Sequence, residues 1–530
     1  MDAYTAYKQE LNIPAQNRSW VLRGEGMDRF FFEQEDIPVP GKNEVLMRVD
    51  AVSICFSDVK LIKAGSNHPR VLVPLEDRPT VPGHEVSLTA VRAGENVKDM
   101  FVPGSRYIIQ ADIFKNGKID TFGYTQRGGM ALCVLVKETA VKGDAGCYLL
   151  PVRETTGYSE AALVEPWACV ESSYHITQSS SLSASSKIFL HPALDMLEKG
   201  LADKGCTGIS RKPRSEADRV FIPSDISGEE YAEIEEQACD GAVIGIVDAG
   251  KGASLPVDAG AIHYRNLRIV SGSMDTIMPR VETGNRQGLK PGGKALFVGA
   301  GGPMGQMHVQ RAVELENGPA CIAVTDVNGE RLGFITERFS GTAHECSVNF
   351  SVFDASGPTD TLRDNLLEYS EGGFDDIVML APVPALVAES QHLTREGTLI
   401  NIFAGIPVGS PFLYDTALAS GNNISFTGHS GSSLEDLAQA LSMVEHGKIR
   451  SDRIVRAIGG LEVLKNGVKA VMEGVYAGKV VIYPHLGSLP LISLDDLSEE
   501  YPDVSTKLDN GHWNRGAEQA LFNMLLRTGR

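Results

Sequence analysis

The sequence predicts an α/β protein in which an antiparallel β domain is followed by a doubly wound parallel sheet. Three observations lead to this prediction. From Trp20 to Val52, apolar and polar residues alternate between turn signals, a pattern typical of antiparallel strands. From Lys294 onward, short apolar runs alternate with helix-like stretches, as a parallel βαβ sheet requires. Between them lies a segment that repeats part of the later unit.

Length and composition set the broad class. The chain has 530 residues, enough for about three domains at roughly 150 residues each. Its net charge of -19 argues against a nucleic-acid partner, because no basic patch is available for a phosphate backbone. Neither an apolar run of about 18 residues nor a signal peptide is evident, so we expect a soluble cytoplasmic protein with no membrane association.

Two short polar motifs follow the clearest strand of the first domain, Glu44–Asp50. The first is Cys55-Phe-Ser-Asp58 and the second is Gly83-His-Glu85. The eight cysteines show no disulfide framework, and Cys55 is the one whose neighbours suggest chemistry. A thiol, an imidazole and a carboxylate are thus placed close together in the chain.

Together with the glycine-rich turn described below, these motifs resemble those of the medium-chain zinc-dependent alcohol and polyol dehydrogenases. Gly104–Tyr107 and Gly128–Val136 are similar to two further segments of that family, and Glu165-Pro-Trp167 to the Glu-Pro segment of its sorbitol and threonine dehydrogenase branch. A second likeness, based on the Gly-Pro-Met-Gly turn and the acidic C-terminal residues, is to the sorbose-1-phosphate reductases. The resemblance implies a GroES-like antiparallel β catalytic domain joined to a Rossmann domain.

The same residues make a physical case for zinc. Thiolate, imidazole and carboxylate are the ligands of an open catalytic site, which keeps one position for water or substrate. Cys55 and His84 are the first two expected ligands, and either Glu85 or Glu165 is the third, with the other as a direct or water-mediated partner. The region from 109 to 126, where relatives carry a four-cysteine lobe, has no cysteine, so we expect one zinc.

Three neighbouring side chains are expected to assist catalysis. Ser57 is placed to relay the proton of a substrate hydroxyl, and Asp58 to orient an imidazole from behind the metal. Lys60 stands where relatives often carry a histidine, which changes the remainder of the relay. With His68 and Arg70, it is alternatively part of a cationic patch suited to a phosphate or carboxylate.

An internal repeat precedes the nucleotide-binding unit. At a constant offset of 156 residues, seven positions between 241 and 272 are identical to positions between 397 and 428. We therefore interpret residues 186–280 as an inserted, degenerate Rossmann-like copy. Its first strand leads into His191-Pro-Ala-Leu-Asp195, which lacks the glycines that let a backbone approach a pyrophosphate.

The complete copy begins at Lys294 and carries a glycine-rich turn. Two registers fit, Gly299-x-Gly301 or Ala300-x-Gly302-x-x-Gly305, and the second is favoured because Gly305 then permits close packing of helix on strand. The pyrophosphate is expected on the helix N-terminus. The expected cofactor-binding residues are Gly299, Gly301, Gly302, Pro303, Met304, Gly305, Asp326, Ala404 and Gly405.

Asp326 indicates which nucleotide is bound. It ends the second strand, Cys321–Asp326, and lies 21 residues after Gly305. A carboxylate there accepts hydrogen bonds from the ribose hydroxyls and repels a 2′-phosphate, which favours NAD over NADP. Ala404 and Gly405 follow a later strand, where loops face the cofactor crevice.

The predicted organisation has four parts. Residues 1–185 form the zinc-binding catalytic domain, 186–280 the degenerate copy, 281–455 the NAD-binding domain, and 456–530 a return to the catalytic domain with an acidic extension. The expected activity is hydride transfer between NAD(H) and a secondary alcohol or ketone of a sugar, polyol or sugar phosphate. We expect a homo-oligomer. Two other classes stay open: a redox-neutral sugar epimerase or lyase with tightly bound NAD, and a non-catalytic binding protein.

Overall fold

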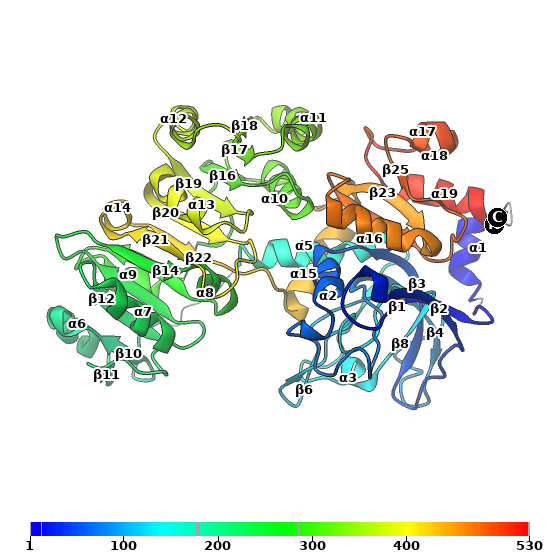
Figure 1. Ribbon diagram of the computed structural model, residues 1–530, viewed down its shortest axis with the longest axis horizontal. Coiled ribbons are helices and arrows are strands. Elements are labelled where there is room, and N and C mark those ends of the chain that lie inside the picture. Colours follow the sequence, from blue (N-terminus) through cyan, green and yellow to red (C-terminus); the bar gives the residue numbers. More distant parts are fainter. Residues whose placement is uncertain (1, 12, 176–180, 285, 528–530) are drawn as a thin grey trace. The chain divides into compact units, whose positions relative to one another are not determined.

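The computed structural model describes residues 2–11, 13–175, 181–284 and 286–527. The chain forms two compact units, the first made of Met1–Cys169 with Ser432–Arg530 and the second of Val170–Gly431 (Figure 1). We predicted boundaries at residues 185 and 455. The units divide earlier in the chain, after Cys169 and before Ser432. The boundary at 280 separates no units, because residues on both sides of it share one sheet.

Unit 1 is built on a mainly antiparallel sheet. Its strand order in the described residues is β25-β23-β24-β3-β4-β5-β9, with β8 also paired to β3. The strands that define it are β3 (Val45–Ser53), β4 (Glu85–Ala93), β5 (Arg106–Ile109), β8 (Cys133–Val136), β9 (Leu149–Val152), β23 (Val455–Gly460), β24 (Lys479–Tyr483) and β25 (Ile492–Ser493). A separate pair is formed by β1 (Asn17–Leu22) and β2 (Phe30–Glu35). The antiparallel β domain is thus present as predicted.

Helices cover the sheet of unit 1 and close its ends. They are α1 (Ala3–Gln9), α2 (Phe56–Ala64), α3 (Glu138–Val141), α4 (Tyr158–Ala162), α5 (Val164–Ser172, which runs on into unit 2), α15 (Leu434–Glu445), α16 (Leu464–Glu473), α17 (Leu497–Glu500), α18 (Pro502–Ser505) and α19 (Arg515–Arg527). Every residue of β3 is buried, which places this strand in the core.

The acidic C-terminal extension is part of the core of unit 1. Trp513 is fully buried and donates a hydrogen bond to the Tyr483 hydroxyl over 2.9 Å. Glu518 is also fully buried and accepts hydrogen bonds from the amides of Tyr158 and Ser159. The extension therefore packs against the sheet rather than lying on the surface.

Unit 2 is built on an eleven-stranded sheet, counted over the described residues, with order β11-β10-β12-β13-β15-β22-β20-β19-β16-β17-β18. Its strands are β10 (Lys187–Leu190), β11 (Gly208–Ser210), β12 (Arg219–Pro223), β13 (Val243–Val247), β15 (Arg268–Gly272), β16 (Lys294–Val298), β17 (Cys321–Asp326), β18 (Asn349–Asp354), β19 (Phe374–Met379), β20 (Thr394–Ile402) and β22 (Ser425–Thr427). The strands are parallel within each half of the sheet, and β15 and β22 join the halves in antiparallel fashion.

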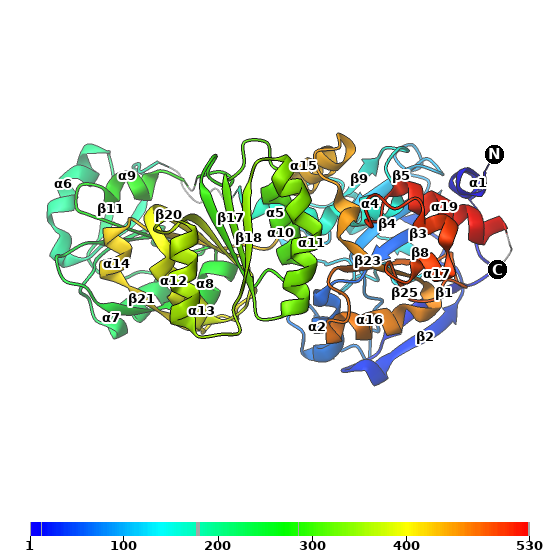
Figure 2. The ribbon, with the colours of Figure 1, turned by 90° about the horizontal axis from the view of Figure 1, so that it is seen from above.

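The helices of unit 2 connect these strands as crossovers. They are α6 (Met196–Asp203), α7 (Gly228–Gln237), α8 (Ala259–Tyr264), α9 (Ile277–Glu282), α10 (Pro303–Glu314), α11 (Gly329–Glu345), α12 (Thr359–Tyr369), α13 (Pro384–Ser390) and α14 (Thr416–Gly421). Figure 2 shows α10 and α11 beside β17 and β18; α11 packs against both strands, and α10 packs against β16 and β17. Parallel strands with helical connections are the arrangement predicted for the nucleotide-binding unit.

The two halves of the sheet correspond element by element to the sequence repeat. β13, β14 (Ser254–Asp258), α8 and β15 match β20, β21 (Pro411–Asp415), α14 and β22 in order and in offset. Gly241 and Gly397, which are equivalent in the repeat, share a φ of +77°, a left-handed conformation that favours glycine. The copies meet through equivalent strands, since β14 pairs with β21 and β15 with β22. They are therefore related by an internal two-fold pseudosymmetry.

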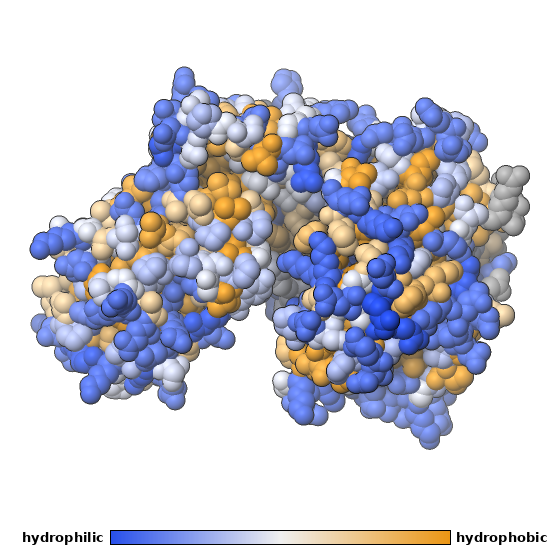
Figure 3. All heavy atoms as spheres, in the orientation of Figure 1, coloured by the Kyte–Doolittle hydropathy of each residue, from blue (hydrophilic) through white to orange (hydrophobic). Residues whose placement is uncertain are grey.

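The surface is mostly hydrophilic on the face that Figure 3 shows, where apolar residues form small groups among charged ones. No helix in the described part of the chain is both long and apolar enough to cross a membrane.

Candidate metal and nucleotide sites

The candidate metal ligands come from strand ends that the sheet brings together. In the sheet of unit 1, β3 lies between β24 and β4, which both run antiparallel to it. Cys55 follows the end of β3, whereas Glu85 begins β4 and Lys479 begins β24. Antiparallel neighbours place the start of one strand beside the end of the next. Residues far apart in sequence thus meet at one edge.

Cys55, His84 and Glu85 form a group with metal-binding geometry. One ligand atom from each, the thiol sulfur, a ring nitrogen and a carboxylate oxygen, lies within 4.8 Å of the others. His84 and Glu85 are buried, and Cys55 is half-buried. Oε2 of Glu85 is buried and has no hydrogen-bond partner among the described residues. This donor set and the unpartnered oxygen fit a zinc ion.

Asp58 connects the two loops that carry these ligands. Its carboxylate accepts hydrogen bonds from the amide of Cys55 over 2.9 Å and from the amide of Gly83 over 3.1 Å. Its Oδ1 lies 3.3 Å from Nδ1 of His84. Burial alone would lower the pKa of His84, but the Asp58 carboxylate raises it well above its usual value. Asp58 has the contacts expected of a residue that orients the imidazole.

The two glutamates differ in their place at the site. Glu85 belongs to the group with metal-binding distances, whereas Glu165, in the first turn of α5, does not. Burial raises the pKa of Glu165 to about 7, against the opposing effect of His84 and together with the charge of Glu85. Glu165 is therefore a neighbour of the ligands, and the geometry favours Glu85 as the third one.

Lys479 and Tyr124 adjoin the ligands and were not singled out by the sequence motifs. The Lys479 ammonium forms a buried ion pair with Oε1 of Glu85. Tyr124 is buried, and its ring centroid lies 5.8 Å from that of His84. The one signal for Lys479 is its place at the start of the apolar run 480–483, and Tyr124 carries no signal in the sequence.

The expected relay residues differ in exposure. Ser57 is half-buried, and its Oγ lies 3.1 Å from Nε2 of His84. Lys60 is exposed on α2. His68 and Arg70 both contact Tyr124, with ring centroids 5.2 Å apart for His68 and a guanidinium 5.4 Å from the ring for Arg70.

The glycine-rich turn in unit 2 has the conformation of a nucleotide-binding loop. Gly299 has a φ of +75°, and Gly302 is the N-cap of α10, whose first residue is Pro303. A Cβ at Gly305 would lie 2.5 Å from the backbone of Ala300, so only glycine allows this approach of helix to strand. The close contact supports the second register. Gly302, Pro303 and Met304 are partly exposed at the helix N-terminus, where amide groups are available to an anion.

The remaining expected cofactor residues lie at the carboxyl ends of two other strands of the same sheet, β17 and β20. Asp326 ends β17 and accepts a hydrogen bond from the amide of Gly301. Ala404 and Gly405 follow β20, and the Ala404 amide donates to the carbonyl of Met379 over 2.9 Å. In the degenerate copy, the equivalent turn is a 3-10 helix over Pro192–Leu194.

A thiol, an imidazole and a carboxylate grouped in unit 1, in a chain that also carries a largely parallel α/β sheet with a glycine-rich turn, are the combination expected of a zinc-dependent dehydrogenase. Residues 41–148 match the family of the alcohol dehydrogenase GroES-like domain. The resemblance to the medium-chain zinc-dependent alcohol and polyol dehydrogenases is thereby confirmed. The chain is an enzyme of the oxidoreductase class.

Particular relatives extend the similarity over the whole chain. L-sorbose 1-phosphate reductase of Klebsiella pneumoniae is 23% identical over 510 residues, 95% of this chain and 97% of that one. Sorbitol dehydrogenase of Homo sapiens is 35% identical over 162 residues, 28% of this chain and 42% of that one. Among solved structures, 2R,3R-butanediol dehydrogenase from Bacillus subtilis has a TM-score of 0.56 at 16% identity, covering 88% of this chain and 99% of that one, and shares the fold.

Proposed function

We propose that this protein is a zinc-dependent dehydrogenase that transfers a hydride between NAD(H) and a secondary alcohol or ketone of a polyol, sugar or sugar phosphate. The observation that carries the proposal is the group formed by Cys55, His84 and Glu85. These residues would hold the metal, and Asp58 would fix the imidazole. When bound, zinc supplies Lewis acidity to the substrate oxygen.

The chain itself provides a path for the substrate proton. Ser57 Oγ lies 3.1 Å from the ring nitrogen of His84, so a hydroxyl bound at the ligands is within reach of the serine. Burial raises the pKa of Tyr124, while the charge of His84 and a hydrogen bond with Ser57 act in the opposite direction. Ser57 and Tyr124 together form the proposed relay, in the place of the histidine that Lys60 replaces.

The cationic patch of Lys60, His68 and Arg70 supports a phosphorylated substrate. Burial lowers the pKa of His68, and the charges of Arg70 and Lys60 lower it further, so the three side chains are electrostatically coupled. Arg70 also pairs with Asp112 over 2.9 Å, which reduces the net positive charge. Tyr124 contacts His68, Arg70 and His84 and so links this patch to the metal ligands.

The nucleotide side of the proposal rests on unit 2. The turn from Gly299 to Gly305 presents amides to a pyrophosphate, and Asp326 accepts hydrogen bonds from the ribose. Ala404 and Gly405 are the proposed contacts of the nicotinamide end. A carboxylate at Asp326 favours NAD over NADP.

Substrate oxidation and metal content, measured on the same sample, test the proposal. Polyols and their phosphate esters are offered with NAD, and NADH absorbance is recorded. We expect activity, about one zinc per chain, and loss of both in Cys55→Ser. Cys346→Ser, at an exposed cysteine, is the matched control and should keep both.

Two results would contradict the proposal. Full zinc and activity in Cys55→Ser would exclude the metal site, and turnover of a sugar without net NADH would indicate a redox-neutral enzyme. A specific test of the patch is Arg70→Gln, which should raise KM for a phosphate ester while leaving KM for the free polyol nearly unchanged.

A further inference from the structure

A hollow in unit 2 gathers arginine side chains that the proposed function does not use. Its volume is about 250 Å³. Arg268 of β15 and Arg280 of α9 line it from the first copy of the repeat, and Gly397 of β20 and Ser425 of β22 line it from the second. The hollow thus lies where the two copies meet. None of its lining residues belongs to the glycine-rich turn or the metal group.

The two guanidinium groups are only partly satisfied by the chain. Nη1 of Arg268 donates to the carbonyl of Thr283 over 2.6 Å, and Nη2 of Arg280 donates to Oγ of Ser425 over 3.0 Å and to the carbonyl of Asn423. The Nε atoms of both arginines are buried without a hydrogen-bond partner in the described part of the chain. Buried donors are normally paired, so the chain does not use the full hydrogen-bonding capacity of either guanidinium group.

The charges at the hollow are also uncompensated. Arg268 is 4% exposed. Burial lowers its pKa to about 10, and the only neighbouring charges among the described residues that act on it, Arg280 and Arg219, are also positive. Glu396 acts on Arg280 but also accepts a hydrogen bond from Asn423. In a chain of net charge -19, a buried Arg268 and a half-buried Arg280, neither in an ion pair with a carboxylate among the described residues, require a reason.

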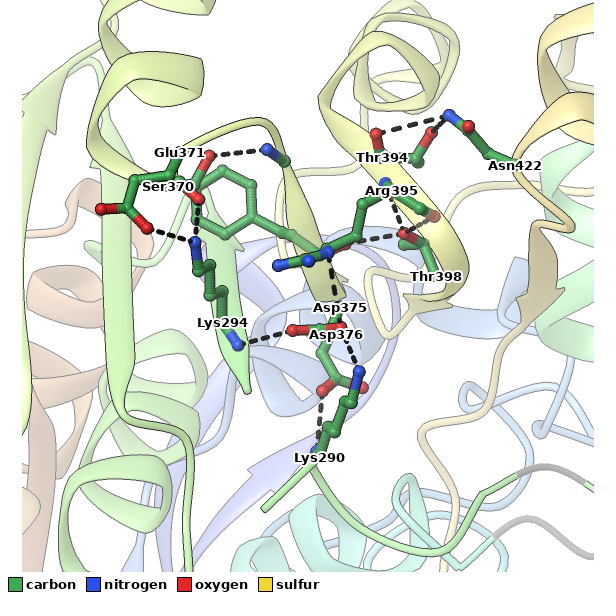
Figure 4. Close-up of polar contacts among 12 residues, drawn as sticks. Lys290, Lys294, Ser370, Glu371, Asp375, Asp376, Thr394, Arg395, Thr398 and Asn422 are labelled. Carbon is green, nitrogen blue, oxygen red and sulfur yellow. Dashed lines mark hydrogen bonds and ion pairs between the residues drawn. The ribbon is translucent and has the colours of Figure 1, made fainter. Parts of the chain in front are cut away.

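Neighbouring cations in the same unit show the usual arrangement. Lys290 pairs with Asp375 over 2.6 Å, and Lys294 with Glu371 over 3.2 Å (Figure 4). Arg286, which also lines the hollow, pairs with Asp376 over 2.6 Å. Arg268 and Arg280 depart from this pattern, and both face one cavity.

We propose that the hollow binds a phosphate dianion, either free or as the phosphate group of a small metabolite. Guanidinium groups match phosphate oxygens in charge and in planar, two-pronged geometry. A phosphate would accept hydrogen bonds from both arginines and offset their mutual repulsion. Because the residues come from both copies, occupancy stabilises their junction. This site is independent of the oxidoreductase activity.

Thermal unfolding of the full-length protein tests the site. Inorganic phosphate is titrated in the presence of saturating NAD, which occupies the nucleotide turn, and sodium chloride at equal ionic strength is the reference. A ligand that binds the folded state raises the midpoint with its concentration. We expect saturable stabilisation by phosphate, and affinity for phosphate about tenfold to a hundredfold weaker in Arg280→Gln.

Three variants distinguish the hollow from other phosphate sites. Arg70→Gln removes the substrate patch and should leave intact the part of the phosphate response that Arg280→Gln abolishes. Arg280→Lys keeps the charge without the two-pronged geometry and should give an intermediate affinity. Arg268→Gln loses only the hydrogen bond to the Thr283 carbonyl, so we expect this variant to fold. If Arg280→Gln does not fold, the affinity of Arg268→Gln for phosphate tests whether the hollow is the binding site.

The outcomes separate the proposal from a purely structural role. Equal responses to phosphate in wild type, Arg280→Gln and Arg268→Gln would overturn it, as would equal stabilisation by chloride. A hexose phosphate that binds more tightly than inorganic phosphate, with the same loss in Arg268→Gln, identifies a metabolite as the source. Equal affinities identify free phosphate.

Discussion

The amide of Gly301 donates a hydrogen bond to Oδ2 of Asp326 over 2.7 Å, so the residue proposed to select the nucleotide also holds the turn proposed to bind it. Oδ1 of the same carboxylate accepts from the amide of Asn328 over 3.0 Å. Asp326 is 8% exposed, and each oxygen retains a lone pair for a ribose hydroxyl. The glycine-rich turn and Asp326 are therefore joined by hydrogen bonding, as the proposed roles of both require.

Replacing Asp326 with alanine should weaken NAD binding and narrow the preference for NAD over NADP. Loss of charge-assisted hydrogen bonds costs about 1.5 to 3 kcal/mol, a factor of roughly 10 to 100 in affinity. Asp326→Asn keeps an acceptor for the Gly301 amide and should lose less NAD affinity. Calorimetric titration with both nucleotides measures the ratio. Wild-type protein that already prefers NADP would show that the carboxylate does not read the ribose.

A second prediction concerns the buried pair of Lys479 and Glu85. Lys479→Met leaves a buried carboxylate without its partner, and breaking such a pair typically costs about 3 to 5 kcal/mol. We expect a fall of this size in the free energy of unfolding of metal-free protein, measured with denaturant. In Lys479→Met/Glu85→Gln, where the charge is also removed, most of the loss should be recovered.

Measuring the stability of Lys479→Met with and without zinc tests whether Glu85 coordinates the metal. If Glu85 is a metal ligand, a bound cation replaces the missing lysine, and the deficit of Lys479→Met should shrink when zinc is added. The same deficit with zinc and with a chelator would mean that Glu85 does not coordinate the metal.

Features set by neighbouring residues could be predicted from the sequence, whereas contacts between residues far apart in the chain could not. Strand β17 coincides with the predicted Cys321–Asp326, because a short apolar run between turn signals is a local pattern. Lys479 and Glu85 are 394 residues apart, and only the order of strands in the sheet brings them together. Tyr124 likewise reaches the site through tertiary packing.

The repeat illustrates the same limit at the level of domains. Its offset was visible in the sequence, and so was its first strand, since β10 (Lys187–Leu190) leads into His191 as predicted. The antiparallel pairing of Ile269 with Phe426 merges the copies into one sheet. Pairing between distant strand edges depends on which edges are left open, and a single sequence carries no signal for it.

A third prediction concerns pH and Glu235 of α7. Burial raises the pKa of this carboxyl from 4.5 to about 7, partly offset by hydrogen bonds from Tyr231 and the Asp258 amide. The folded state therefore holds a proton that the unfolded state releases at lower pH, so stability falls as pH rises from about 4.5 to 7. This rise in the pKa of Glu235 corresponds to a loss of roughly 3 kcal/mol in the free energy of unfolding.

Glu235→Gln should remove this part of the pH dependence, because an amide does not titrate. Denaturant unfolding at pH 5 and pH 8 gives the comparison: wild type should lose more stability than the variant between the two values. Glu233→Gln, on an exposed position of the same helix, is the control and should behave as wild type. Parallel pH profiles for wild type and Glu235→Gln would contradict the assignment.

The last prediction separates the two copies as nucleotide sites. Gly302 has a φ of -79°, and a Cβ there would meet no atom within 4 Å, so Gly302→Val should fold normally. The added side chain would occupy the space of the pyrophosphate at the start of α10. We expect loss of NAD binding with zinc retained and little change in stability. Ala193→Val, at an exposed position in the equivalent turn of the first copy, should leave NAD affinity unchanged, since Pro192 offers no amide hydrogen and Asp195 adds negative charge. Calorimetry gives both affinity and stoichiometry. Two NAD per chain would show that the first copy also binds the nucleotide. Binding that is lost in Ala193→Val and kept in Gly302→Val would assign the nucleotide to the first copy.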